Sequence, residues 1–262
     1  MTPRKAVAAP LTAFVLHSWD WSETSLIVEL FSRERGRVVV AAKGAKRPYS
    51  QLRPVLIPFQ QLVVQLGRTP PEASAEVHLL RSAERLPGPP MPAGAALFAG
   101  FYLNELLLKL LARQDAHENL FDAYAEAVHA LQAADEASVQ LILRSFELML
   151  LRQLGVLPEL NGVTLTVEAL DPDGRYSLQA ETGVVAVMAG EPGVPGRAMV
   201  QLEAALSSGH GAAVRAAARP VLAALRAPLR RVLHYHLGSP VLRTRQVLAD
   251  VHKLIDPPSA RP

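Results

Sequence analysis

Apolar and β-branched residues alternate with polar residues in short runs along the first third of the chain. Runs with this period of two are typical of strands that bury one face. Gly36 stands between the second and third runs, where a tight hairpin turn favours positive φ, and three prolines interrupt residues 43–58. The pattern therefore predicts a small barrel of five strands: Leu11–Leu16, Thr24–Phe31, Val38–Ala42, Phe59–Leu66 and Ala75–Leu80.

A proline-rich segment, residues 86–94, ends the strand pattern and reads as a stiff linker. Helical periodicity follows, and its first run is apolar on nearly every face, which is typical of a helix in a core. Asp135 or Ser138 would cap the third helix, and Gly155 would end it. The expected helices are Ala95–Arg113, His117–Ala133, Ala137–Leu154, Arg197–Leu206, Ala212–Leu237 and Val241–Leu254, the last with Ser239 as cap and Pro240 at its first position.

The sequence predicts a β-hairpin between the third and fourth helices. Val163–Leu170 and Tyr176–Val187 are rich in strand formers, and residues 171–174 between them have turn chemistry. We therefore expect an α+β protein with two domains. Residues 1–86 would form the barrel, and residues 87–262 a mainly helical domain with a small β-hairpin insertion near 163–188.

Composition indicates a globular protein, because half of the 262 residues are apolar. The absence of cysteine excludes disulfides, thiolate nucleophiles and cysteine-based zinc sites. Arg4 and Lys5 before the apolar run Ala6–Leu16 imitate a secretory signal, but Pro10 and Thr12 interrupt that run. Since no apolar stretch reaches the ~18 residues that a membrane span needs, we expect a cytoplasmic protein.

Charge is segregated along the chain. Residues 1–90 carry 12 basic and 7 acidic side chains, residues 91–206 carry 6 and 15, and residues 207–262 carry 9 and 2. Contacts with a polyanion are therefore expected at the two basic ends, and not in the acidic middle.

The densest basic run is Phe31–Arg53, which holds seven cations and one anion. On a hairpin and its following loop, these cations could form a track for a phosphate backbone, with Tyr49 stacking on a base. Trp19 and Trp21 are expected in the first inter-strand loop, where OB-folds hold nucleic acid. The alternative is a solvated charged hairpin whose tryptophans cover the barrel end. The candidate DNA-binding residues are Arg33, Arg35, Arg37, Lys43, Lys46, Arg47, Tyr49 and Arg53.

Catalytic motifs are missing. The sequence contains no Gly-x-x-x-x-Gly-Lys-Ser/Thr loop, no Gly-x-Ser-x-Gly elbow and no His-Glu-x-x-His helix. His234 and His236 have no evident third ligand nearby, and a turn explains Asp171 and Asp173 better than a nuclease site does. We therefore expect no enzyme activity, no cofactor and no metal.

Several short motifs, in the same order along most of the chain, resemble those of the RecO recombination mediators. In the first half they are Phe14-Val15-Leu16-His17, Trp21-Ser22-Glu23-Thr24-Ser25-Leu26, Gly36-Arg37, Ala42-Lys43-Gly44-Ala45 and Leu56-Ile57-Pro58-Phe59. Further on they are Arg81-Ser82-Ala83-Glu84, Tyr102-Leu103-Asn104-Glu105-Leu106, Arg144-Ser145-Phe146-Glu147 and Leu242-Arg243-Thr244-Arg245-Gln246. The resemblance implies an N-terminal OB-fold domain, a helical C-terminal part and no catalytic site. It also implies that the protein binds single-stranded DNA, anneals complementary strands, and works with RecR to load recombinase onto coated single strands.

The chain departs from that family at one place. Many members carry a four-cysteine zinc site after the third helix, whereas the matching stretch Gly155–Gly162 has no cysteine. Zinc is therefore not expected. We expect apolar packing of residues 163–188 against the helices to replace this cross-link.

The basic C-terminal part offers a second candidate surface, for a partner. On a continuous helix, Arg215, Arg219, Arg226 and Arg230 would lie within about 60° of one another, although Pro220 and Pro228 could split this stripe in two. The alternative is a solvated helix face. The resemblance implies that the stripe contacts the acidic, apolar-ended C-terminal tail of the single-strand-binding protein. Leu222, Leu225 and Leu229 would then supply the apolar side.

Two other functions are compatible with the same residues. An RNA-binding OB-fold module would show the same basic hairpin and would differ in a preference for the 2′-hydroxyl. A non-catalytic interaction scaffold would explain the helices but would leave the cations without a role.

Overall fold

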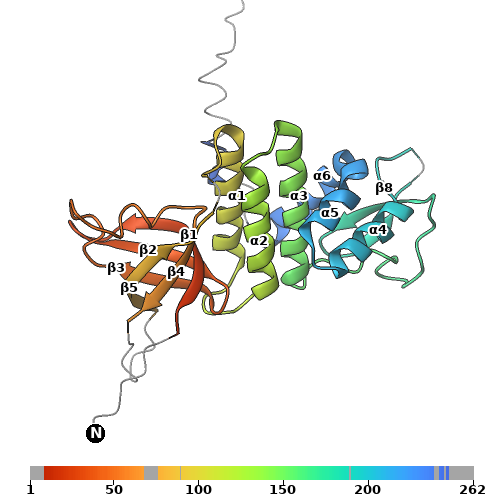
Figure 1. The fold of residues 1–262 in the computed structure, drawn as a ribbon. Coiled ribbons are helices and arrows are strands. Elements are labelled where there is room, and N and C mark those ends of the chain that lie inside the picture. The colour runs from red at the N-terminus through yellow and green to blue at the C-terminus, as the bar shows by residue number, and fades with distance from the viewer. Residues whose placement is uncertain are drawn as a thin grey trace, which may run out of the picture. The chain divides into compact units, whose positions relative to one another are not determined.

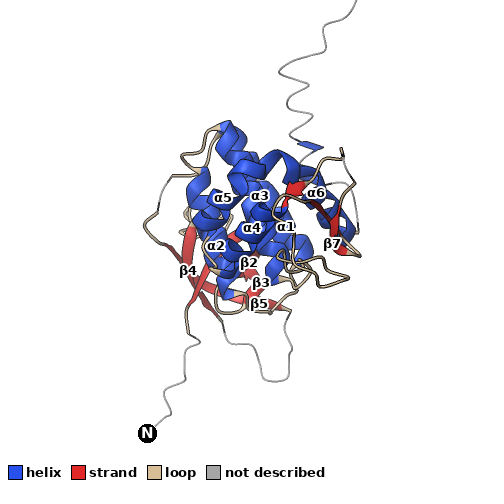
Figure 2. Cartoon of the chain, turned by 90° about the vertical axis from the view of Figure 1, so that its right-hand side faces the viewer, coloured by secondary structure: helices blue, strands red, loops and turns tan. Residues whose placement is uncertain are grey.

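The computed structural model describes residues 9–67, 76–88, 90–188, 190–238, 242–244 and 246–247. The chain forms two compact units, and neither unit is continuous in sequence. The first comprises residues 1–92 and 111–125, and the second comprises residues 93–110 and 126–262. Figures 1 and 2 show that the first is built mostly of strands and the second mostly of helices.

The first unit contains a closed barrel with the strand order β1-β2-β3-β5-β4. All neighbouring strands are antiparallel except β3 and β5, which are parallel. This arrangement confirms the predicted five-stranded OB-like barrel. The strands are β1 (Leu11–Asp20), β2 (Leu26–Ser32), β3 (Gly36–Ala42), β4 (Gln61–Leu66) and β5 (Val77–Arg85).

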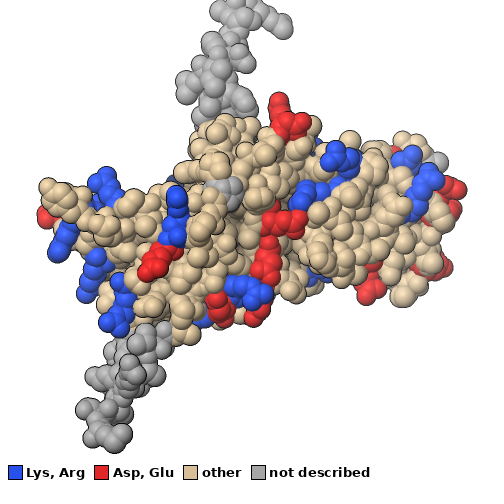
Figure 3. Space-filling model, viewed as in Figure 1, with Lys and Arg blue, Asp and Glu red and all other residues tan. Residues whose placement is uncertain are grey.

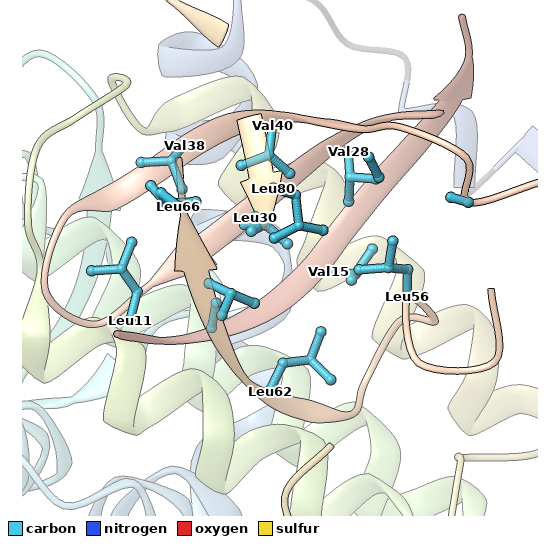
Figure 4. Close-up of a cluster of buried hydrophobic side chains, with 14 residues drawn as sticks. Leu11, Val15, Val28, Leu30, Val38, Val40, Leu56, Leu62, Leu66 and Leu80 are labelled. Carbon is cyan, nitrogen blue, oxygen red and sulfur yellow. The ribbon is translucent and has the colours of Figure 1, made fainter. Parts of the chain in front are cut away.

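Alternate residues of each strand fill the barrel, as Figure 4 shows. Leu11, Ala13 and Val15 point inward from β1, and Val38 and Val40 from β3. This is the alternation that a pleated strand requires, since successive side chains point to opposite faces. The apolar residues that recur at every second position of the sequence are therefore the ones that fill the barrel.

The outside of the barrel is covered by residues from the segment 111–125. The rings of Phe14 and Phe31 lie 5.3 and 5.5 Å from the ring of Phe121, and Phe14 lies 5.1 Å from Tyr124. All of these aromatic side chains are buried. The segment therefore completes the hydrophobic packing of the first unit, although 18 residues of the second unit separate it from the barrel in sequence.

Gly36 makes the β2–β3 turn that the sequence predicts. Its φ is 64°, which a residue without a Cβ adopts at little cost. A Cβ at this position would also overlap the backbone carbonyl of Asp115. The turn is thus shaped both by its own backbone and by the segment that packs against it.

The second unit is mainly helical, with six α-helices among the described residues, one of which, α2, contributes to both units. The carboxylate of Asp135 caps α3 by accepting the Ser138 amide at 2.8 Å. Gly155, just beyond α3, has a φ of 70°. The helices are α1 (Gly94–Leu110), α2 (Glu118–Leu131), α3 (Glu136–Gln153), α4 (Gly196–Ser207), α5 (Gly211–Ala218) and α6 (Leu222–Leu237), with a 3₁₀ turn, η1 (Arg219–Val221), between the last two.

A small sheet with the order β7-β6-β8 lies in the second unit: β6 (Arg175–Gln179), β7 (Gly183–Ala186) and β8 (Val194–Pro195). A hairpin is present in the expected region, but its two strands, β6 and β7, both fall on the single strand predicted at Tyr176–Val187, which is divided by a turn at 180–182. The prediction of a partner strand at Val163–Leu170 is wrong. Val167 adopts a φ of 59°, and its amide donates to the Val163 carbonyl at 2.8 Å, so this stretch turns instead of extending.

An ion pair anchors residues 155–162, the stretch that the resemblance matches to a zinc site. Arg152 of α3 donates to both carboxylate oxygens of Glu203 of α4, at 2.8 and 2.6 Å. The same arginine donates to the Pro158 carbonyl, and Glu203 also accepts the Leu160 amide at 2.7 Å. Apolar packing of residues 163–188 was expected to replace the zinc cross-link, and the structure adds a charged cluster that ties residues 155–162 to α3 and α4.

The last predicted helix, Val241–Leu254, and its caps at Ser239 and Pro240 lie mostly outside the described residues. Within residues 242–247, the Gln246 amide donates to the Leu242 carbonyl at 3.2 Å. The Glu105 carboxylate of α1 accepts the amides of Arg243 and Thr244. No helix in the described ranges is both long enough and apolar enough to cross a membrane.

Candidate nucleic-acid interface

The loop that follows β3 presents exposed cations. Lys43, Arg47 and Arg53 are open to solvent, and the ring of Tyr49 is 94 % exposed. The loop is built from tight turns, since Gly44 has a φ of 72° and its carbonyl accepts the Arg47 amide at 3.1 Å. The backbone is thus held in a defined shape while these side chains project from it.

Lys46 ties this loop to the turn between β1 and β2. Its Nζ lies 3.2 Å from the Asp20 carboxylate and donates to the Ser22 carbonyl at 3.2 Å. Its backbone amide donates to the Thr24 carbonyl at 3.0 Å. The two loops therefore form one continuous surface at an end of the barrel, and Lys46 serves as its internal brace.

Trp19 and Trp21 lie on this surface and are 43 % and 56 % exposed. Trp21 is in the turn between β1 and β2, as predicted. Trp19 is not in the loop but in β1, opposite Ile27 of β2. The strand extends to Asp20 because its backbone pairing with β2 continues beyond the buried part of β1.

Arg33 and Arg35 of the β2–β3 hairpin are half-buried, unlike the exposed cations of the loop after β3. Arg33 forms ion pairs with Glu118 at 2.8 Å and Asp122 at 3.1 Å, and the hydrogen bond to Asp122 raises the pKa of its guanidinium. Burial, and then the charge of Arg35, lowers the pKa of His78. The predicted single track of cations is therefore interrupted by the acidic start of α2.

Arg37 is buried in the barrel wall. Its Nε and Nη2 donate to the Glu29 carboxylate at 3.0 and 2.6 Å, and its Nη1 donates to the Leu111 carbonyl at 2.5 Å. Glu29 is 1 % exposed and is approached by Arg113 at 3.4 Å. Burial takes Arg37 out of the track that the sequence predicts, because a phosphate cannot reach it.

The remaining exposed cations suit contact with an extended anion. In the view of Figure 3, blue side chains outnumber red ones over the barrel, which Figure 1 places at the left. Exposed Lys and Arg side chains can neutralise backbone phosphates, and neighbouring aromatic rings can stack on unpaired bases. The barrel-end surface, as we name it, comprises Trp19, Trp21, Lys43, Lys46, Arg47, Tyr49 and Arg53.

The four C-terminal arginines do not form one stripe. The helix breaks at the 3₁₀ turn around Pro220, so Arg215 and Arg219 are separated from Arg226 and Arg230. Arg215 forms an ion pair with Glu126 at 2.7 Å. Only Arg226 and Arg230, one turn apart on α6, remain as a pair beside a concave surface.

That surface is a groove of about 270 Å³ within the second unit. Leu225 and Leu229 are fully buried, so they cannot supply its apolar side as the sequence suggested. Leu222 borders a smaller adjoining hollow. Besides Arg226 and Arg230, the groove is lined by Ala95, Phe98, Ala99, Tyr102, Glu136, Val139, Gln140, Leu143, Arg144 and Thr244.

Arg144 in this groove belongs to a buried polar network. It donates to Glu147 at 2.6 Å, and the Tyr102 hydroxyl donates to the other oxygen of the same carboxylate at 2.5 Å. Among the described residues, the buried Nε of Arg144 has no hydrogen-bond partner. The sequence shows the motif around Arg144 but does not reveal that it lies in a groove. The residues that complete the groove come from three helices that are far apart in sequence.

The two aspartates considered for metal chemistry serve a turn, and the two histidines lie on α6. The Asp171 carboxylate accepts the Asp173 amide at 3.0 Å, and the Asp171 carbonyl accepts the Gly174 amide at 3.1 Å. Across the residues that the structure describes, no group of three His, Asp or Glu side chains could hold a metal ion.

Comparison with known families decides the relationship. Residues 10–75 match the model of the Recombination protein O N terminal domain, and residues 91–246 match that of the Recombination protein O C terminal domain. The chain belongs to the RecO family. The two matches fall on the barrel and on the mainly helical part, so the resemblance seen in short motifs extends over most of the chain.

Relatives named DNA repair protein RecO cover nearly the whole length. The protein of Verminephrobacter eiseniae is 49 % identical over 92 % of this chain and 96 % of its own. That of Delftia acidovorans is 48 % identical over the same shares. That of Acidovorax ebreus is 46 % identical over 97 % of this chain and all of its own. A general role in DNA repair and recombination follows.

The RecO motifs map onto both candidate surfaces. Residues 21–26 form the turn that Lys46 braces, and residues 42–45 begin the basic loop. Residues 102–106 and 144–147 supply the Tyr102–Glu147–Arg144 network beside the groove. These four of the nine short motifs therefore lie at the two candidate surfaces.

Proposed function

We propose that this RecO-family chain binds single-stranded DNA at the barrel-end surface. The observation that carries the proposal is the loop after β3, on which Lys43, Arg47, Tyr49 and Arg53 are all exposed while Lys46 fixes the loop to the tryptophan-bearing turn. Cations spaced along a fixed backbone match a flexible polyanion, and the rings suit unpaired bases.

A salt titration tests this proposal. Replacing Lys43, Arg47 and Arg53 by Gln should weaken binding of single-stranded DNA and flatten its log–log salt dependence by ~0.7 for each phosphate that the protein no longer neutralises. A matched control removes the same charge from exposed positions of the second unit, Arg197, Arg231 and Arg243. If the barrel variant keeps the wild-type slope, or if the control loses as much, the site lies elsewhere.

The replacement of Lys43, Lys46 and Arg47 together should also lower affinity and flatten the slope. Because Lys46 braces the two loops, its removal should add a loss that does not depend on salt. The same titrations with RNA of equal length separate a DNA-binding protein from an RNA-binding module, since only the latter would prefer the 2′-hydroxyl.

We further propose that the chain is not an enzyme and anneals complementary strands by neutralising their phosphates. Electrostatic neutralisation brings strands together without a chemical step. Annealing of complementary oligonucleotides should therefore proceed in the absence of nucleotide and divalent metal. A strict requirement for ATP would contradict this mechanism.

Work with RecR in loading recombinase onto coated single strands is proposed from the family relationship. Sedimentation of mixtures with purified RecR tests it, and the expected result is a complex heavier than either protein. Loading is measured as recombinase assembly on coated DNA, which should need both proteins.

The groove of the second unit is proposed as the site for the C-terminal tail of the single-strand-binding protein. Arg226 and Arg230 stand beside apolar surface from Phe98, Val139 and Leu143, which suits an acidic peptide with an apolar end. Such a peptide should bind with micromolar affinity, about −8 kcal/mol, and more weakly as salt rises.

Replacement of Arg226 and Arg230 by Glu should abolish that peptide binding. Replacement of Arg197 and Arg231 by Glu makes the same charge change outside the groove and should leave binding unchanged. Peptide binding that survives the first pair of changes in a folded protein would place the tail on another surface.

A further inference from the structure

The two tryptophans of the chain are both exposed, and both lie on the barrel-end surface. They are separated by one residue, Asp20, at the point where β1 passes into the following turn. Large apolar side chains that are exposed together at one place often mark an interaction site, whereas single exposed apolar residues are common on any protein. Exposure of both tryptophans beside exposed cations therefore favours a ligand that is both apolar and anionic.

The fold holds this pair in a defined way. A register irregularity between Val15 and His17 separates the buried first half of β1 from its exposed second half. Such irregularities redirect side chains at binding sites. The His17 ring then packs edge-on against Trp19, with 4.4 Å between ring centroids and 72° between ring planes. The His17 ring supports the indole from one side, and the Trp19 side chain remains 43 % exposed.

The turn beyond Trp19 is fixed by the basic loop. Lys46 holds the Asp20 carboxylate, which stands between the two tryptophans, and the Ser22 carbonyl, which follows Trp21. The brace leaves both indoles exposed while it limits the movement of the backbone that carries them. Preorganised rings lose little conformational freedom when a ligand stacks on them.

We propose that Trp19 and Trp21 form a stacking platform for unpaired nucleobases, next to cations that contact the phosphates. This inference rests on the proposed function and adds a base-contacting site to it. Unpaired bases expose a π-face that an indole can cover, whereas the bases of a duplex are already stacked on each other. The platform therefore selects single strands over duplex without reading sequence.

Intrinsic fluorescence tests the platform directly, because the chain has only these two tryptophans. The probes are oligothymidylate and an abasic oligonucleotide of the same length, which keeps the phosphates and lacks the bases. Oligothymidylate should quench the tryptophan emission and bind more tightly. The abasic strand should bind through charge alone, with little quenching.

Variants assign the effect to each ring. Trp19→Ala and Trp21→Ala should each weaken oligothymidylate binding about five-fold or more, and leave abasic binding unchanged. Trp19→Phe and Trp21→Phe should restore much of the affinity, and each leaves one tryptophan as reporter. Tyr235→Ala removes an exposed ring of the second unit and is the control. Near-ultraviolet circular dichroism and thermal melting establish that each variant is folded.

The outcomes separate this inference from the proposed function. If both probes bind equally well, without quenching and with no loss in folded alanine variants, the platform is wrong while DNA binding at the cations stands. If neither probe binds the wild-type chain, the proposed function fails and the platform fails with it.

Discussion

Replacing Glu29 by Gln should destabilise the barrel unit by about 3–5 kcal/mol, because it leaves the buried Arg37 without its counter-charge. Glu29 is 1 % exposed and accepts two hydrogen bonds from Arg37, at 3.0 and 2.6 Å. The Leu111 carbonyl still accepts from Arg37 in the variant, which places the expected cost near the lower end of that range.

Arg113 provides an internal comparison on the same carboxylate. Its side chain is 49 % exposed, and its nearest approach to Glu29 is 3.4 Å. Arg113→Ala should therefore cost only about 0–1 kcal/mol, the value typical of solvent-exposed ion pairs. Replacing Glu29 and Arg37 together by Met should recover most of the loss, since no unpaired charge stays buried.

Urea unfolding at neutral pH, followed by tryptophan fluorescence, measures these differences. Trp19 and Trp21 both lie in the first unit, so the signal reports that unit alone. A Glu29→Gln variant that stays within about 0.5 kcal/mol of the wild type, the range of ordinary surface changes, would refute the prediction. An Arg113→Ala variant that loses as much stability as Glu29→Gln would refute it as well.

Three other changes should each show a measurable effect. Gly36→Ala should lower the melting temperature and raise the urea sensitivity of the first unit, because a Cβ would overlap the Asp115 carbonyl and the φ is positive. Burial alone would raise the pKa of Glu203, but hydrogen bonds and the charge of Arg152 outweigh it and lower that pKa below 4.5. Glu203→Gln should therefore destabilise the protein at pH 7, and the difference from wild type should shrink as pH falls below 4.5, in melts recorded across that range. Glu105→Gln should loosen residues 243–244, whose amides it accepts, and speed their cleavage in limited proteolysis.

The barrel could be predicted from the sequence because apolar residues recur at every second position of its strands. Leu11, Ala13 and Val15 alternate with residues that face outward, and Gly36, with its positive φ, marks the β2–β3 turn. The same alternation gave a wrong prediction at residues 163–167, where the sequence Val-Thr-Leu-Thr-Val has the pattern of a strand. The backbone turns there because Val167 takes a left-handed φ, which no local preference of a β-branched residue would indicate.

The candidate site was predicted only in part, for a physical reason. Periodicity shows that a charged residue on a strand faces away from the barrel interior, but not what it meets outside. Residues 111–125 return to the barrel and bring Glu118 and Asp122 to Arg33, and the Leu111 carbonyl to Arg37. Glu29, the other partner of Arg37, lies on the neighbouring strand β2. In the loop after β3, Lys43, Arg47 and Arg53 are exposed, whereas Lys46 is half-buried and paired with Asp20. Their contact with DNA stays a prediction.

The return of residues 111–125 to the barrel sets an order of events during synthesis. The five strands leave the ribosome first, yet the ring faces of Phe14 and Phe31 stay uncovered until Phe121 and Tyr124 have also emerged. A nascent chain cut after the linker would thus carry a barrel with an apolar outer face and with Arg37 lacking its acceptor at Leu111. Translation must proceed through the whole of α1 and into α2 before the first unit has all of its packing partners, so the two units are made by overlapping, not successive, stages of elongation.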